Sequence, residues 1–185
     1  MTVRPWFTIP ELGIVGDRTI EQQAHAVRPA LEEAKGKTVL DVGCAEALLT
    51  REFARAGAER CVGLELLREH LEIAEKVCKG FPIELRQQNM NDVQPAKVAE
   101  RFDIVLALGI LHKLRWPGEG ARWVARSCAG LLLFRAKGGV HDGLVRSKHF
   151  VHKANVHDIF REEGLEMDRV VQGLNDEQVE YWRRA

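Results

Sequence analysis

TVLDVGCAEALLT, at residues 38–50, is the stretch that decides the fold of this chain. Its first five residues form an apolar run interrupted only by Asp41, which is typical of a strand buried on both faces of a parallel sheet. Gly43 follows at once and permits a tight turn, because glycine adopts backbone conformations that other residues resist. Residues 45–56 then have the pattern of a helix that ends at Gly57. A strand, a glycine turn and a helix indicate the first half of a β-α-β unit.

The same alternation of strands and helices continues along the chain. Further helices are expected at 19–35, 68–79, 120–129 and 154–163. Further strands are expected at 61–64, 83–86, 103–108, 131–135, 166–172 and 179–184. In the first helix Thr19 is the expected N-cap, and Pro29 should kink or divide it. The apolar early strands predict a parallel sheet covered by helices on both faces.

Charge is balanced over the whole chain but not along it. The 185 residues suit one domain with a sizeable core, and Lys+Arg and Asp+Glu both number 27, so net charge indicates no polyanionic partner. Residues 113–161 hold ten Lys/Arg against three acids, a net of +7, and residues 162–185 hold three Arg against seven acids, a net of −4. The basic tract suits either contact with phosphate or a solvated surface balanced by the acidic tail.

Cysteine usage and the absence of a long apolar segment indicate a cytoplasmic protein. The four cysteines form no CxxC pair and are expected to be reduced. The N-terminus has no apolar core of signal-peptide length, and the longest apolar run, 104–111, is too short to cross a bilayer. No metal site is expected, because the spacing of the histidines in one short stretch matches no tight zinc pattern; they are His141, His149, His152 and His157.

An acidic residue at the end of the second strand indicates the class of ligand. Glu65 lies 22 residues after Gly43, close to the roughly 20 residues that separate a glycine turn from a ribose-binding acid in nucleotide-binding sheets. The dinucleotide fingerprint G-x-G-x-x-G would need glycine where this chain has Ala45 and Leu48. An adenosine-type ligand without a pyrophosphate therefore fits better.

Four segments together resemble the class I S-adenosylmethionine-dependent methyltransferases. VLDVGCAEA (39–47) is similar to that family's first motif, V-L-D-x-G-C-G-x-G, and differs at Ala45 and Ala47. VGLEL (62–66) is similar to the segment with the ribose-binding acid, and QQNMNDV (87–93) to the segment that faces the adenine. FDIVLALGILH (102–112) is similar to the fourth motif, which lines the donor and acceptor sites. The resemblance covers roughly residues 36–184.

The resemblance implies a fold and its division along the chain. We expect an α/β, three-layer Rossmann-like methyltransferase fold, with a mostly parallel seven-stranded sheet whose last strand is antiparallel. Residues 166–172 and 179–184 would be the sixth and seventh strands. The whole chain, 1–185, is expected to be a single methyltransferase domain. Residues 1–35 would form its N-terminal segment and lead helix, and residues 36–185 its Rossmann-like core.

The resemblance also implies that S-adenosylmethionine lies across the tips of the first, second and fourth strands. Asp41, Gly43 and Cys44 would hold its methionine side, and Glu65 its ribose. Asn89 and Met90 would flank the adenine, with Leu108 and Gly109 as the floor near the methyl group. The implied cofactor-binding residues are Asp41, Gly43, Cys44, Ala45, Glu46, Glu65, Leu66, Asn89, Met90 and Leu108.

Catalysis needs little from the side chains. The donor is already activated, so positioning of the acceptor supplies much of the rate, and a base is needed only if the acceptor must lose a proton. His112 is the candidate base, or else a loop histidine that only packs. Trp6 and Phe7 would either cover the cofactor or anchor the N-terminal segment.

Two functions stay open. The first is transfer of a methyl group to a small molecule or to RNA, with no membrane partner. The second is a catalytically degenerate methyltransferase fold that acts as a binding or partner subunit. Ala45 and Ala47 motivate the second, since Ala47 in particular would narrow the pocket near the methionine part of the cofactor.

Overall fold

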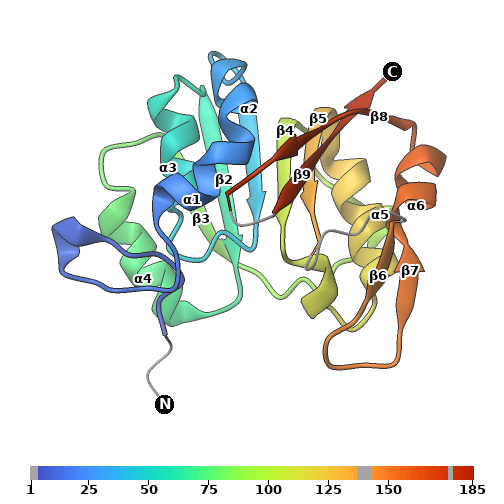
Figure 1. Cartoon of the computed structure of the whole chain (residues 1–185), viewed down its shortest axis with the longest axis horizontal. Helices are drawn as coiled ribbons and strands as arrows, with labels where there is room; N and C mark the ends of the chain where they lie inside the picture. Colours follow the sequence, from blue (N-terminus) through green and yellow to red (C-terminus); the bar gives the residue numbers. More distant parts are fainter. Residues whose placement is uncertain (1–3, 137–142, 175–176) are drawn as a thin grey trace.

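A computed structural model describes residues 4–136, 143–174 and 177–185 and contains a seven-stranded sheet (Figure 1). The strand order is β3-β2-β1-β4-β5-β9-β8. The strands are β1 (Thr38–Val42), β2 (Arg60–Glu65), β3 (Ile83–Gln87), β4 (Phe102–Leu108), β5 (Cys128–Arg135), β8 (Leu165–Gln172) and β9 (Gln178–Arg184). Strand β9 runs antiparallel to both its neighbours, β5 and β8, and the four other pairings are parallel. The predicted sheet with an antiparallel last strand is confirmed.

Helices cover both faces of this sheet. They are α1 (Ile20–Ala24), α2 (Arg28–Glu32), α3 (Leu48–Arg55), α4 (Arg68–Val77), α5 (Pro117–Ser127) and α6 (Val156–Glu162). Short 3₁₀ turns are η1 (Pro10–Leu12), η2 (His25–Val27), η3 (Pro95–Lys97) and η4 (Leu111–Lys113). The first four helices lie together on the left of Figure 1, and α5 and α6 lie on the right.

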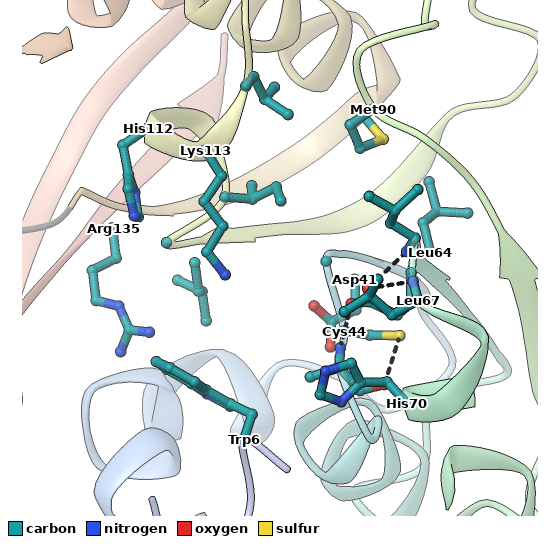
Figure 2. Close-up of a pocket in the computed structure, with 18 of the residues that line it drawn as sticks. Trp6, Asp41, Cys44, Leu64, Leu67, His70, Met90, His112, Lys113 and Arg135 are labelled. Atoms are coloured by element: carbon teal, nitrogen blue, oxygen red, sulfur yellow. Dashed lines mark hydrogen bonds between the residues drawn. The ribbon is translucent and has the colours of Figure 1, made fainter. Parts of the chain in front are cut away.

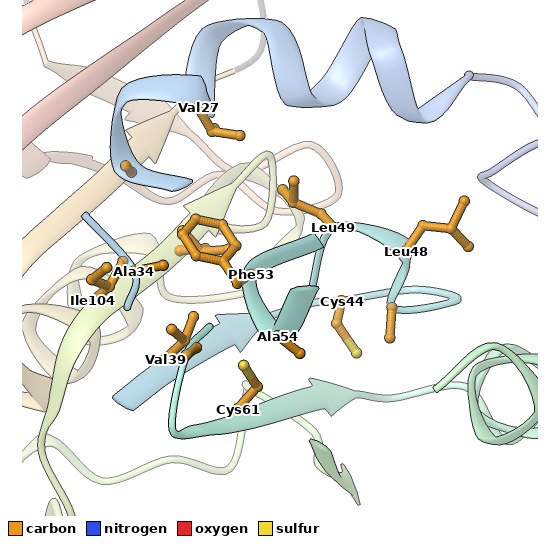
Figure 3. Close-up of a cluster of buried hydrophobic side chains, with 14 of the residues drawn as sticks. Val27, Ala34, Val39, Cys44, Leu48, Leu49, Phe53, Ala54, Cys61 and Ile104 are labelled. Carbon is orange, nitrogen blue, oxygen red and sulfur yellow. The ribbon is translucent and has the colours of Figure 1, made fainter. Parts of the chain in front are cut away.

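Side chains of alternating direction divide the core into two clusters. In β4, Ile104 and Leu106 pack with α2 and α3 in one cluster, whereas Val105 and Ala107 pack with α5 and α6 in the other. Successive residues of a strand point to opposite faces, so the continuous apolar strands serve both clusters. Figure 3 shows the first cluster, in which Phe53 of α3 lies between Val27 and Val39. Both clusters contain residues of β1 and β4, so packing fixes the positions of the carboxyl ends of these strands.

The lead helix is divided where proline predicts it. Thr19 caps α1 through a capping box with Gln22, and η2 separates α1 from α2, which has Pro29 in its first turn. Proline lacks the N–H that a continuous helix would need at that position. The expected N-cap and the expected break are both confirmed.

Helix α3 begins three residues later than the sequence predicts. Ala45 and Ala47 have φ values of 50° and 55°, in the left-handed region. Residues in that conformation extend the turn, so the first helical residue is Leu48. Each such alanine costs roughly 1–2 kcal/mol relative to right-handed backbone, which the surrounding packing must offset.

A two-stranded hairpin, β6 (Leu144–Arg146) and β7 (Lys153–Asn155), is the element that the sequence did not predict. Each strand has three residues, too few for a period-2 pattern to be distinguished. The hairpin lies beside η4, where the amide of Lys148 donates to the carbonyl of His112 (2.6 Å). This contact brings a distant part of the chain to the carboxyl end of β4.

Candidate functional site

A cavity of about 810 Å³ opens at the carboxyl ends of the central strands (Figure 2). Asp41 and Gly43 contribute to its wall from the end of β1, Glu65 from the end of β2, and Leu108 and Gly109 from the end of β4. Ligands of open α/β sheets bind at this edge, where the strand order reverses. The volume lies in the range of small-molecule and cofactor sites, which is roughly 300–1,000 Å³.

The turn after β1 brings backbone close to the cavity. Gly43 has φ 77°, and a Cβ at this position would lie 3.0 Å from Cδ1 of Ile110. Ala45 lines the cavity, whereas Ala47 is fully buried in the core cluster and is not a wall residue. The expectation that Ala47 narrows the pocket is therefore wrong. Ala47 is the N-cap of α3, and its side chain belongs to the core cluster.

Asp41 lies buried beneath this turn. Its Oδ2 accepts a hydrogen bond of 2.7 Å from Oγ1 of Thr50. Burial raises the pKa of Asp41 to about 6, although the bond from Thr50 opposes the shift. Burial likewise raises the pKa of the neighbouring Cys44 thiol well above its usual value, which agrees with a packing role rather than a nucleophilic one.

Glu65 is held by three backbone amides at the mouth of the cavity. Oε1 accepts from the amides of Leu66 (2.7 Å) and Leu67 (2.9 Å), and Oε2 accepts from the amide of Ala45 (3.1 Å). The carboxylate therefore fastens the β1–α3 turn to the end of β2. A carboxylate offers about four acceptor positions, so one position on Oε2 is left for a ligand hydroxyl.

The segment after β3 forms the wall next to Glu65. Asn89 and Met90 line the cavity, together with Gln88 and Leu66. Oδ1 of Asn89 accepts from the backbone amide (3.0 Å) and the side-chain amide (3.2 Å) of Asn91. Met90 is 6% exposed, so it presents a small apolar surface beside the Asn89 amide.

Glu46 does not line the cavity, so its position gives no support to the predicted contact with the cofactor. Its side chain is fully buried, and its oxygens accept from the amides of Trp6 (2.9 Å) and Phe7 (3.0 Å) and bond to Nδ1 of His70. Burial acts to raise the pKa of Glu46, but these bonds outweigh it and the pKa is lowered, while the bond to Glu46 raises the pKa of His70. The opposite shifts describe an ionised pair.

This Glu46–His70 pair fixes the N-terminal segment against the cavity. Trp6 lines the cavity, as Figure 2 shows, while Phe7 is buried in the core. Phe7, which also borders the cavity, anchors the segment in the core, and the role of Trp6 as a cover for the cofactor stays a prediction. Because Glu46 follows the glycine turn directly, the same turn positions the cavity wall and its aromatic cover.

The opposite side of the cavity is basic. His112 and Lys113 come from η4, Arg135 from the end of β5 and Lys148 from the turn of the β6–β7 hairpin. In Figure 2, His112, Lys113 and Arg135 face the cavity from the side opposite Asp41 and Leu67. Nη1 of Arg135 donates to Oε1 of Gln23 and to Oε2 of Glu177 (2.8 Å).

Most other residues considered from the sequence lie outside the cavity. Trp116 is 48% exposed and stacks on His152, with ring centroids 3.7 Å apart. His157 bonds to Glu180, whereas His149 does line the cavity. His141 lies outside the described residues. Within the described ranges, no group of three or more potential metal-ligating side chains comes together.

Sequence reasoning missed several wall residues. The missed residues with polar or charged side chains include Arg4, Arg18, Gln23, His70, Lys113, Arg135 and Glu177. Arg135 could have been identified as a wall residue from the sequence, because it ends an otherwise apolar strand at the edge where ligands bind. Lys148 belongs to the basic tract that the sequence indicated as a candidate for phosphate contact, although the hairpin that carries it was not predicted.

Comparisons with known proteins agree on the family. A model of the methyltransferase domain family matches residues 39–131. The ubiquinone biosynthesis O-methyltransferase of Actinobacillus pleuropneumoniae serotype 5b is 36% identical over 102 residues, which cover 52% of this chain and 42% of that protein. The chain thus spans less than half the length of this curated relative.

Solved structures agree on the fold. An S-adenosylmethionine-dependent methyltransferase from Mesorhizobium loti has a TM-score of 0.67 at 14% identity, covering 88% of this chain and 100% of that one. The N-methyltransferase NodS from Bradyrhizobium japonicum, in complex with S-adenosyl-L-homocysteine, has a TM-score of 0.66 at 19% identity, covering 86% and 83%. At these identities the likeness shows the fold alone.

Proposed function

The chain belongs to the class I, Rossmann-like, S-adenosylmethionine-dependent methyltransferases, and we propose that it transfers a methyl group from that donor to a small-molecule acceptor in the cavity described above. The observation that carries this proposal is the position of Glu65. Its carboxylate stands at the cavity mouth beside the Gly43 turn and retains room for a ligand hydroxyl.

The wall residues fit the parts of the donor in order. Glu65 would accept hydrogen bonds from the ribose, and Asn89 with Met90 would flank the adenine. Gly43, Cys44 and Ala45 would border the methionine part with Asp41 beneath them, while Leu66 would lie against the nucleoside. The closeness of Ile110 to Gly43 supports this arrangement, because any side chain at Gly43 would enter the cavity. Glu46 is absent from this set, since its carboxylate is engaged by Trp6, Phe7 and His70.

The chemistry that remains for this chain is positioning. When bound, S-adenosylmethionine supplies a methyl group already activated on its sulfonium. Leu108 and Gly109 would form the floor on which the acceptor meets that group, and Trp6 would exclude water from one side. His112, on η4, borders the same space and is the proposed base for an acceptor that must lose a proton.

A small acceptor is favoured over RNA because part of the basic tract is neutralised. Arg122 pairs with Glu162 and Glu163, Arg126 pairs with Glu163, and Arg161 pairs with Asp158. The contacts of Arg122 and Arg126 use the acidic tail as the balancing partner that the charge distribution suggested, whereas Asp158 lies within the basic tract itself. A salt-dependent nucleic-acid surface would need several such cations free on one face.

The degenerate-subunit alternative has less support. Of its two motivating residues, Ala47 contributes its methyl group to the core, and Ala45 borders a cavity that is still about 810 Å³. The chain is proposed to act as one domain, because α1, α2 and residues 6–7 share the core cluster and the cavity with the Rossmann-like part. A cytoplasmic location is proposed from the four free, buried cysteines. Within the described residues, no helix is long and apolar enough to cross a membrane.

Calorimetric titration with S-adenosylhomocysteine tests the proposal. We expect binding by the unmodified protein and a loss of about 2 kcal/mol, or about 30-fold in Kd, in Glu65→Gln, since hydrogen bonds to a charged acceptor are lost. Glu69→Gln, on the exposed first turn of α4, is the matched control and should bind as the parent does. A parent protein that does not bind the ligand would reject the methyltransferase proposal. Unchanged affinity in Glu65→Gln would reject the assignment of the ribose.

A further inference from the structure

Charge is divided between the two ends of the cavity. The acids Asp41 and Glu65 lie at the ends of β1 and β2. At the other end the only acid among the described wall residues is Glu177, and it is shared by Arg18 and Arg135. Two guanidinium groups on one carboxylate leave a net positive charge even before the lysines are counted. This end therefore attracts an anion.

Lys113 adds a further positive charge at this end of the cavity. Its side chain reaches into the cavity in Figure 2, and its Nζ lies 5.6 Å from the centroid of the Trp6 ring. In the part of the chain that the structure describes, no carboxylate lies within ion-pair distance of it. Protein atoms around the ammonium desolvate it and lower the pKa of Lys113, which Glu65 opposes and Lys148 and Arg135 reinforce.

Arg135 brings positive charge to the end of β4. Among the described residues, Nη1 donates to Gln23 and to Glu177. Nη2 faces the strand end instead, since a Cβ on Gly109 would lie 3.7 Å from it. The guanidinium therefore borders the position at which the proposed acceptor meets the methyl group. It is held there by a buried network and costs no ordering when a ligand arrives.

Lys148 completes the cluster from the β6–β7 hairpin. Its amide bonds to the carbonyl of His112, so the hairpin turn is fixed against η4. Lys148 and Lys113 both line the cavity, and the bond to His112 holds the hairpin turn at the residue next to Lys113 in the chain. Three cations from η4, β5 and the hairpin thus converge on one end of the cavity. We call Lys113, Arg135 and Lys148 the cationic lobe.

We propose that the cationic lobe binds a carboxylate of the acceptor, so that the substrate class is small organic acids and Lys113 determines the specificity. This inference rests on the proposed function. A carboxylate offsets the cost of holding Lys113 in a partly desolvated space without a partner, and a charge-assisted hydrogen bond to it is stronger there than in water. The carboxylate orients the acceptor, and no bond changes at that group. The methionine part of the donor also has a carboxylate, which the same cations could bind. The test must therefore distinguish the carboxylate of the acceptor from that of the donor.

The first measurement compares benzoate with benzamide, which have nearly the same shape but differ in charge. Each is titrated into protein saturated with S-adenosylhomocysteine, at constant ionic strength because exposed charges are screened by salt. We expect benzoate to bind about tenfold more tightly than benzamide, or more. In Lys113→Met this ratio should fall to about one. Lys113→Arg should retain the preference, and Lys97→Met, an exposed lysine on η3 outside the cavity, should match the parent.

The second measurement identifies the source of the carboxylate. S-adenosylhomocysteine and methylthioadenosine, which lacks the amino-acid part, are titrated into the parent and Lys113→Met. We expect both Kd values to change by less than about twofold. A loss confined to S-adenosylhomocysteine would assign Lys113 to the donor carboxylate and overturn the proposal. Equal binding of benzoate and benzamide by the parent, or no binding of either, would also overturn it. If the parent does not bind S-adenosylhomocysteine, the proposed function fails, and the benzoate comparison on the unliganded protein still decides the charge preference.

Discussion

The two ends of the cavity differ in the kind of group that forms them. At the end formed by β1 and β2, the fixed groups are backbone: a glycine turn and three amides that hold Glu65. At the opposite end, the fixed groups are side chains that arrive from η4, β5 and the β6–β7 hairpin. Backbone at strand ends is dictated by the fold, whereas side chains can change without altering it. The first end therefore suits a donor common to a family, and the second an acceptor particular to one protein.

The largest predicted effect comes from removing the carboxylate of Glu46, which holds Trp6 and Phe7 in place. In Glu46→Ala, the amides of Trp6 and Phe7 and the ring of His70 lose a fully buried partner. We expect a loss of about 3 kcal/mol in the free energy of unfolding, because breaking a buried pair leaves the other groups unsatisfied. Urea denaturation followed by tryptophan fluorescence measures it, and Glu59→Ala, at an exposed position, is the control.

Both ends should respond to Glu46→Ala. Trp6 lines the cavity and lies next to Lys113, so its release should weaken the binding of both S-adenosylhomocysteine and benzoate. Glu46→Gln keeps an acceptor for the amides but removes the charge facing His70, and it should lie between the parent and the alanine variant. A variant as stable as Glu59→Ala would show that residues 6–7 are held by packing alone.

The next prediction separates two aspartates at opposite ends of the sheet. Asp41, beneath the donor end, has a folded-state pKa of about 6, raised by burial from 3.8. A raised folded pKa contributes stability below the unfolded value and loses it as the pH rises through the folded one. Asp41→Asn should therefore gain stability over the parent as the pH rises from about 4 to about 6, by roughly 2–3 kcal/mol at neutral pH.

Asp103 at the start of β4 is the matched comparison for Asp41. Hydrogen bonds from the backbone and hydroxyl of Thr38, both 2.8 Å, lower the pKa of Asp103. Its contribution to stability is present above its unfolded pKa and is lost as the pH falls, which is the opposite sign. Asp103→Asn should thus destabilise the protein at neutral pH. Denaturation at pH values from 3.5 to 7.5, roughly spanning both transitions, measures both, and parallel profiles for the two variants would contradict the assignment.

The same division explains what the sequence could predict. The strands of the sheet, the Gly43 turn and the place of Glu65 follow from apolar runs, a glycine and a carboxylate that are read locally in the sequence. The buried contacts of Glu46 could not be predicted because its partners, Trp6 and His70, lie 40 and 24 residues away and their approach depends on the tertiary fold. The cationic lobe depends on the hairpin, which has too few residues per strand to leave a period. Local sequence patterns can therefore predict a site that is formed by backbone groups. A site formed by side chains from distant segments is assembled only by the tertiary fold.

The smallest predicted effect tests whether the donor end is strained by its two left-handed alanines. Ala45→Gly relieves a φ of 50° at a half-buried wall position, and should raise stability by about 0.5–1 kcal/mol once the greater entropy of the unfolded chain is subtracted. Ala47→Gly relieves a φ of 55° but also removes a methyl group that is fully buried in the core, worth about 0.8 kcal/mol. Its stability should therefore stay close to that of the parent. Thermal denaturation of the two variants side by side measures the difference. An Ala45→Gly variant less stable than Ala47→Gly would show that the turn is shaped by the Glu65 bond to Ala45 and carries no backbone strain, because glycine would then only have loosened it.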